Sequence, residues 1–79
     1  MPIRVLLIDD HAMFREALRV MLEKEPDIEV IGELGDGALV EQTVARNVPD
    51  VVVMDISMPT VHGIEATRRL LASHPRLRV

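Results

Sequence analysis

Short aliphatic runs, bounded by acidic or turn-forming residues, divide the chain and predict its strands. The most apolar run, Val51–Met54, follows Pro49-Asp50 and ends at Asp55, as expected for a strand covered on both faces of a parallel sheet. In the run Ile28–Leu34, Glu29 and Glu33 interrupt the apolar positions, which suits a strand at the edge of the sheet. The predicted strands are therefore Ile3–Ile8, Ile28–Leu34 and Val51–Met54.

Between these strands the apolar residues follow a helical period. The first helix is expected to open at Asp10 and to stop near Pro26, and the second is expected to be capped by Asp36. The first helix carries an i, i+3, i+4, i+7, i+8 apolar stripe made of Phe14, Ala17, Leu18, Met21 and Leu22. Helices are predicted over His11–Glu25, Ala38–Asn47 and Ile64–Ser73, the last ended by His74-Pro75.

The alternation of strands and helices predicts an α/β fold with a doubly wound parallel sheet. With the most apolar strands in the centre, the spatial strand order is 2-1-3-4, and Leu77–Val79 begins the fourth strand. Right-handed crossovers put the first helix on one face and the other two helices on the opposite face. The fourth strand is cut short, so the sheet is expected to be incomplete, with one face partly bare.

Composition narrows the class of protein. The 79 residues allow one small domain, and Phe14 is the only aromatic residue, so the core must be aliphatic. The net charge of −4 argues against nucleic-acid contact by this segment. The absence of cysteine excludes disulfides and thiolate metal sites. No run approaches the ~20 apolar residues of a membrane span and no signal peptide is evident, so a cytoplasmic protein is expected.

Acidic residues follow the two strands between which the strand order reverses. Asp9 and Asp10 come after the first strand and Asp55 after the third, and ligands bind at this edge of doubly wound sheets. Three converging carboxylates repel one another unless a cation lies among them. Hard oxygen ligands with room for water suit Mg²⁺ better than zinc or copper. The alternative is that the three aspartates only cap helices and hold no metal.

A magnesium ion beside a carboxylate suits phosphoryl transfer, in which an aspartate can itself be the nucleophile. Asp55 is the better candidate for this role, because the adjacent Asp9 and Asp10 are better suited to holding metal. The three histidines share no metal-ligand spacing and are expected in loops or at caps. His11 lies beside Asp10 and is therefore placed to modulate the site.

Two segments resemble the receiver domain of response regulators in two-component systems: Val5–His11 with Met13–Arg15 after it, and Met54–Pro59 with Gly63. The acidic pair followed by histidine, with Asp27–Glu33, is similar to the NarL/FixJ (LuxR-type) subfamily in particular. The resemblance runs through essentially the whole chain. It implies a flavodoxin-like fold and a phosphoacceptor rather than an enzyme.

By this resemblance, Asp55 accepts a phosphoryl group from a sensor histidine kinase with the help of Mg²⁺. Asp10 would bind the metal directly, Asp9 mainly through water, and the backbone carbonyl of Ser57 would complete the protein ligands. Pro59 and Gly63 would shape the loop after the acceptor.

The chain also departs from the family. Complete receivers continue through strands that supply a Ser or Thr and a Lys, and LuxR-type regulators add a DNA-binding helix-turn-helix. Residues 1–79 contain none of these and are expected to be the amino-terminal two thirds or so of a receiver, taken from a DNA-binding transcriptional regulator.

Two alternatives of other classes remain open. One is an aspartate-nucleophile phosphohydrolase, although such enzymes usually carry D-x-D after the first strand where this chain has Asp9-Asp10-His11. The other is a truncated fragment without signalling competence. With a bare face and an open sheet edge, such a fragment is expected to form a homodimer or a domain-swapped assembly rather than a stable monomer.

Overall fold

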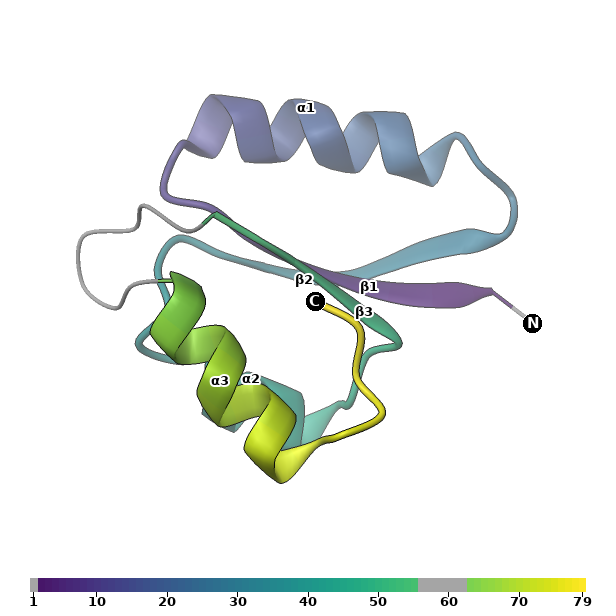
Figure 1. The fold of residues 1–79 in the computed structure, drawn as a ribbon. Coiled ribbons are helices and arrows are strands. Elements are labelled where there is room, and N and C mark those ends of the chain that lie inside the picture. The colour runs from purple at the N-terminus through teal and green to yellow at the C-terminus, as the bar shows by residue number, and fades with distance from the viewer. Residues whose placement is uncertain (1, 56–62) are drawn as a thin grey trace.

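The computed structural model describes residues 2–55 and 63–79, and its strands and helices alternate as the sequence pattern predicts (Figure 1). The ends differ from the predicted ones by two residues or fewer, since helix ends depend on local capping. The elements are β1 (Ile3–Ile8), α1 (Ala12–Glu23), β2 (Ile28–Leu34), α2 (Val40–Arg46), β3 (Val51–Met54) and α3 (Gly63–Ser73).

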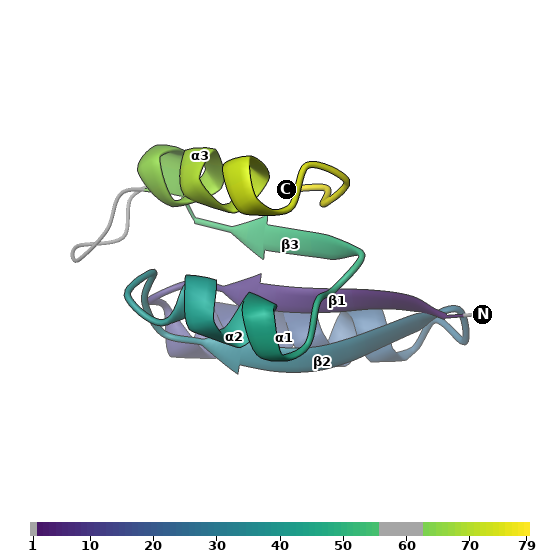
Figure 2. The same cartoon turned by 90° about the horizontal axis from the view of Figure 1, so that it is seen from below.

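The strands form one parallel sheet in the order β2-β1-β3, which confirms the predicted doubly wound arrangement. Helix α1 covers one face of the sheet, whereas α2 and α3 lie together on the other (Figures 1 and 2). An ion pair of 3.8 Å between Arg69 Nε of α3 and Glu41 Oε1 of α2 links the two helices on their shared face. No helix in the described segments is both long and apolar enough to cross a bilayer.

Two predicted helix caps are wrong. His11, and not Asp10, is the residue before the first turn of α1, and its side chain makes no capping hydrogen bond. Asp36 Oδ1 accepts a hydrogen bond from the backbone N–H of Ala38 at 2.7 Å, so it closes a turn ahead of the helix. Helix α2 therefore begins later than predicted, at Val40.

The core consists of two aliphatic clusters, one on each face of the sheet. Alternate residues of β1 point to opposite faces, so Leu6 and Ile8 pack with the α2 and α3 side whereas Val5 and Leu7 pack with the α1 side. The larger cluster contains Leu6, Ile8, Val40, Val44, Val52, Ala66, Leu70 and Leu77. The smaller one contains Val5, Leu7 and Val30, with Leu18 and Leu22 of α1 packed against it.

The apolar stripe of α1 is buried over only part of its width. Leu18 and Leu22 pack on the sheet, whereas the side chains of Phe14 and Met21 are 60% and 65% exposed. Val53 of β3, on the same face, is 41% exposed. Since α1 is the one described helix on this face, the outer half of its stripe has nothing to pack against. The predicted bare face is therefore present.

The predicted fourth strand is reduced to a single parallel bridge. Arg78 pairs with Val51, and the N–H of Val52 donates a hydrogen bond of 2.7 Å to the carbonyl oxygen of Arg78. The bridge lies on the side of β3 away from β1, which is the place predicted for strand four. Within the described part of the chain, this pairing involves only the beginning of β3.

A bulge in β2 turns Glu33 toward α1. Val5 pairs with Val30, but the next residue of β1, Leu6, pairs with Gly32, so Ile31 is left over. The simple alternation of the sequence would place Glu29 and Glu33 on one face, and the bulge separates them. Glu33 then accepts hydrogen bonds from Arg15 Nε at 3.1 Å and from Arg19 Nη1 at 2.6 Å.

These two arginines have a direct electrostatic effect on Glu33. The hydrogen bond from Arg19 is the main reason that the pKa of the Glu33 carboxyl lies below its ordinary value of 4.5, and Arg15 adds to the effect against the cost of burial. The ionised carboxylate thus ties the edge strand to the helix.

Replacing Leu6 by alanine should destabilise the protein by about 2–5 kcal/mol, because Leu6 is 1% exposed and its loss leaves a cavity in the larger cluster. The matched control is Leu71→Ala, since Leu71 is 39% exposed, and its cost should stay below ~1 kcal/mol. Urea unfolding followed by circular dichroism measures both. Equal midpoint shifts in the two variants would contradict the assignment of the core.

Glu33→Gln should flatten the acid side of the stability profile. The depressed pKa means that the carboxylate stabilises the fold fully above the ordinary value of 4.5 and less as the pH falls through the lower value of the folded state. The difference from the parent should be about 1 kcal/mol or less near neutral pH and should shrink as the pH falls below 4.5. Urea midpoints measured from neutral pH into the acid range provide the test, and a constant difference would refute the prediction.

Candidate functional site

Backbone hydrogen bonds bring two of the predicted acidic residues to the same edge of the sheet. The N–H of Asp55 donates to the carbonyl oxygen of Ile8 at 2.9 Å, and the N–H of Asp9 donates to that of Leu34 at 3.1 Å. The sheet ladder thus continues one residue past the ends of β1 and β3. The side chains of Asp9 and Asp55 are each 16% exposed, so both lie partly shielded from water.

Four side chains gather at this edge. Asp9, Asp10, His11 and Asp55 each offer one ligand atom, and these atoms all lie within 4.8 Å of one another. The structure therefore brings together the three carboxylates that the sequence places at the strand ends. Ser57, the remaining predicted ligand, and Pro59 lie outside the described residues, and Gly63 is the first residue of α3.

The position of His11 inside the acidic group goes beyond what its sequence position indicates. Its Nδ1 atom lies 3.0 Å from an oxygen of Asp9, 3.0 Å from one of Asp10 and 3.6 Å from one of Asp55. The hydrogen bond to Asp9, followed by the charge of Asp10, raises the pKa of the imidazole above its ordinary value. The adjacency of His11 to the acidic pair was the one available signal.

Arg15 supports the site from the first turns of α1, a role that sequence analysis missed. Its guanidinium donates a hydrogen bond through Nη1 to the carbonyl oxygen of Asp9 and another through Nε to Glu33. The carboxylate Oδ1 of Asp9 in turn accepts the backbone N–H of His11 at 2.7 Å. These bonds fix the chain between β1 and α1, so Asp9 and Asp10 are held in place before any ligand arrives.

The donor set fits a hard divalent cation. The carboxylate oxygens of Asp9, Asp10 and Asp55 are the ligand type that Mg²⁺ prefers, and their spacing allows them to surround one ion. Asp10 is 30% exposed, which leaves room for the water molecules that Mg²⁺ usually keeps. Asp9 and Asp10 would therefore hold the ion from just after the end of β1, and Asp55 from just after the end of β3.

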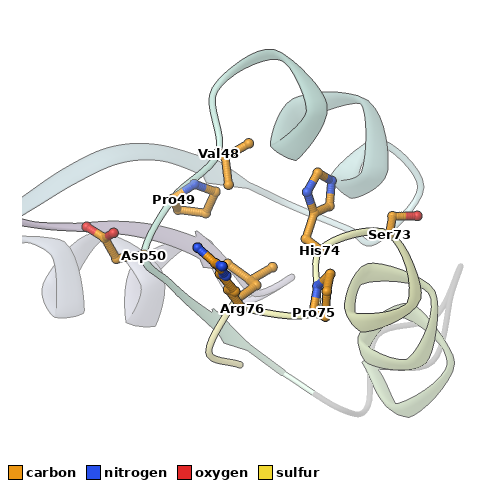
Figure 3. Close-up of a pocket in the computed structure, with 8 residues that line it drawn as sticks. Val48, Pro49, Asp50, Ser73, His74, Pro75 and Arg76 are labelled. Atoms are coloured by element: carbon orange, nitrogen blue, oxygen red, sulfur yellow. The ribbon is translucent and has the colours of Figure 1, made fainter.

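Two cavities lie at opposite ends of β3. One, of about 200 Å³, adjoins the acidic group and runs between α1 and β3, where Phe14, Leu18 and Val53 line it. The other, of about 450 Å³, lies where β3 begins and is lined by Asp50, His74 and Arg76 among others (Figure 3). The larger cavity contains none of the four clustered side chains, so volume alone does not mark the site.

Comparison with known proteins agrees with this geometry. The family model described as the response regulator receiver domain matches residues 5–79. The transcriptional regulatory protein DegU of Brevibacillus brevis is 43% identical over 77 residues, which cover 98% of this chain and 33% of that protein. Protein-glutamate methylesterase/protein-glutamine glutaminase 5 of Anaeromyxobacter dehalogenans is 45% identical over 74 residues, which cover 94% of this chain and 20% of that protein.

A solved structure shares both fold and sequence. The crystal structure of a LuxR-family two-component response regulator from Aurantimonas sp. SI85-9A1 superposes with a TM-score of 0.92 at 35% identity, over 99% of this chain and 56% of that one. The chain spans a third or less of the two curated relatives. The predicted family and flavodoxin-like fold are both confirmed: the chain belongs to the receiver domains of two-component response regulators.

Proposed function

We propose that Asp55 is the residue on which this receiver accepts a phosphoryl group, and that Asp9 and Asp10 hold the Mg²⁺ ion required for it. Receiver domains accept phosphoryl groups in two-component signalling, interact with sensor histidine kinases and bind Mg²⁺ at an acidic pocket. The observation that supports the assignment is the gathering of Asp9, Asp10 and Asp55 within 4.8 Å at the ends of β1 and β3.

Asp55 is proposed to have a different role from Asp9 and Asp10 because it lies on a different segment of the chain. Asp55 follows the end of β3, apart from the adjacent pair Asp9 and Asp10. A carboxylate oxygen of its side chain can attack the phosphorus of a phosphohistidine in line with the leaving nitrogen. An O–P bond forms as the P–N bond breaks, and the electron pair returns to the imidazole of the kinase. Mg²⁺, when bound, offsets the negative charge on the transferring oxygens. Asp9 and Asp10, adjacent in the chain, are the residues proposed to hold it.

For the whole protein we propose a regulator that acts in the cytoplasm, where the receiver controls a DNA-binding output. The similarity to DegU, a transcriptional regulatory protein, supports this. The similarity to a methylesterase of comparable identity offers an enzymatic output as the alternative. In either case the receiver itself is proposed to act as a phosphoacceptor and not as a turnover enzyme. The phosphohydrolase alternative has no support beyond the acidic residues themselves.

We also propose that the 79-residue chain self-associates through the bare face. The groove between α1 and β3 is apolar, and Phe14 and Val53 beside it are 60% and 41% exposed. Exposed apolar surface of this kind next to a partly paired edge strand favours association with a second copy. A stable pair would bury more than ~1,000 Å² in total.

Asp55→Asn should abolish phosphorylation by acetyl phosphate in the presence of Mg²⁺, because the amide lacks the nucleophilic oxygen. In a complete receiver that contains residues 1–79, intact-mass spectrometry should show one added phosphate on the parent and none on the variant, and chelation of Mg²⁺ should suppress the parent's label. The 79-residue chain itself is expected to phosphorylate poorly, because it lacks the Ser or Thr and the Lys of complete receivers. Asp27→Asn is the control, since Asp27 is exposed and lies at the other end of the sheet, where its carbonyl oxygen meets the N–H of Ile3. Persistence of the label in Asp55→Asn would defeat the proposal.

Val53→Lys should shift the chain toward monomer, because it introduces a charge into the groove of the proposed self-association. Val20→Lys is a matched control: Val20 is 54% exposed but lines the other side of α1, next to Glu23 and Glu33. Sedimentation velocity should give an assembly larger than a monomer for the parent and for Val20→Lys, and a smaller species for Val53→Lys. A monomeric parent would refute self-association.

A further inference from the structure

We infer that His11 is a fourth metal ligand at the acidic site, and that its Nδ1 atom lets transition-metal ions such as Zn²⁺ compete with Mg²⁺ there. The inference rests on the proposed metal-binding function of Asp9, Asp10 and Asp55. It adds a nitrogen donor, which the oxygen ligands alone do not provide.

The positions of the ligand atoms support a shared ion. Metal–ligand bonds of ~2.1 Å at right angles place neighbouring ligand atoms ~3.0 Å apart. The Nδ1 atom of His11 lies 3.0 Å from Asp9 Oδ1, to which it is hydrogen-bonded, and 3.0 Å from Asp10 Oδ1. An ion bound between these atoms would replace the proton of that hydrogen bond. The distance from Nδ1 to Asp55 Oδ2 is 3.6 Å, which is between the spacing of adjacent and of opposite ligands. A single ion can therefore reach the imidazole nitrogen and the carboxylates with small adjustments.

The backbone fixes the imidazole near this position. The N–H of His11 donates to Asp9 Oδ1 at 2.7 Å, and its carbonyl oxygen accepts the N–H of Arg15 at 2.9 Å in the first turn of α1. The side chain itself is 68% exposed, so the ring can turn toward an ion without disturbing the core. His11 is thus anchored through its main chain and free to adjust through its side chain.

The chemical type of the donor atom determines which metal ions bind more tightly. Imidazole suits zinc, copper, iron and nickel, whereas carboxylates and water suit magnesium, and divalent affinity rises along the first transition series. A nitrogen ligand should therefore strengthen Zn²⁺ binding much more than Mg²⁺ binding.

Calorimetric titration of the tag-free 79-residue chain with Zn²⁺ and with Mg²⁺ tests the inference. The pH should be about 8, because a ligating imidazole must be neutral. In His11→Gln the Zn²⁺ affinity should fall at least about tenfold while the Mg²⁺ affinity changes little. His74→Gln is the matched control, since His74 lies at the far end of α3 and lines the other cavity. Nitrogen NMR of the parent should show Zn²⁺ shifting the Nδ1 resonance of His11.

The remaining outcomes separate the His11 inference from the proposed Mg²⁺ site. Equal Zn²⁺ affinity in His11→Gln and the parent, or parallel loss of both metals in that variant, would overturn the inference and leave the Mg²⁺ site standing. Zn²⁺ binding that depends on His11 in a chain without Mg²⁺ affinity would overturn both the proposed Mg²⁺ function and the competition between the two ions. Asp10→Asn should weaken both metals, and circular dichroism should confirm that each variant stays folded.

Discussion

The parallel pairing of β1 with β3 is the constraint on which the rest of this molecule depends. Ile8 pairs with Met54, and the next hydrogen bond, from Asp55 N–H to the carbonyl oxygen of Ile8, measures 2.9 Å. Aliphatic side chains on both faces hold this register, because a slip of one residue would exchange the two faces of the strand. Asp9 and Asp55 therefore meet as a consequence of core packing rather than of any attraction between them.

The meeting of like charges has an energetic cost that neighbouring groups reduce. The imidazole of His11 lies among the carboxylates, and the guanidinium of Arg15 binds the carbonyl oxygen of Asp9. Arg15 is itself held by Glu33, which the bulge in β2 turns toward α1. The acidic group is thus one end of a polar network that reaches the edge strand. A preformed network of this kind is suited to receiving a cation without rearrangement of the backbone.

The uneven covering of the sheet connects the site to the surface. Among the described residues, two helices bury one face, whereas α1 is the one helix on the other and leaves Phe14 and Val53 exposed. The groove between them ends at Asp9 and Asp55, so apolar contact surface and acidic site adjoin. A partner that covers this groove would also lie against Asp9 and Asp55.

Local pattern was enough to determine most of the fold. The aliphatic runs located β1, β2 and β3, and the helical periods located α1, α2 and α3, because each pattern depends on burial that repeats along its own segment. Alternation and chirality then gave the strand order and put Asp9, Asp10 and Asp55 at one edge. Caps were less accurate, since Asp36 can bond to Ala38 in a turn as well as to a helix end.

Only the tertiary structure decided which side chains complete the site and which apolar residues stay exposed. His11 enters the acidic group and Arg15 binds behind it because the turn after β1 closes onto β3, a long-range event that no local period encodes. The bulge that turns Glu33, and the exposure of Phe14 despite its place in the apolar stripe, likewise depend on how neighbouring elements pack. Sequence determines what each segment can bury, and packing determines what it meets.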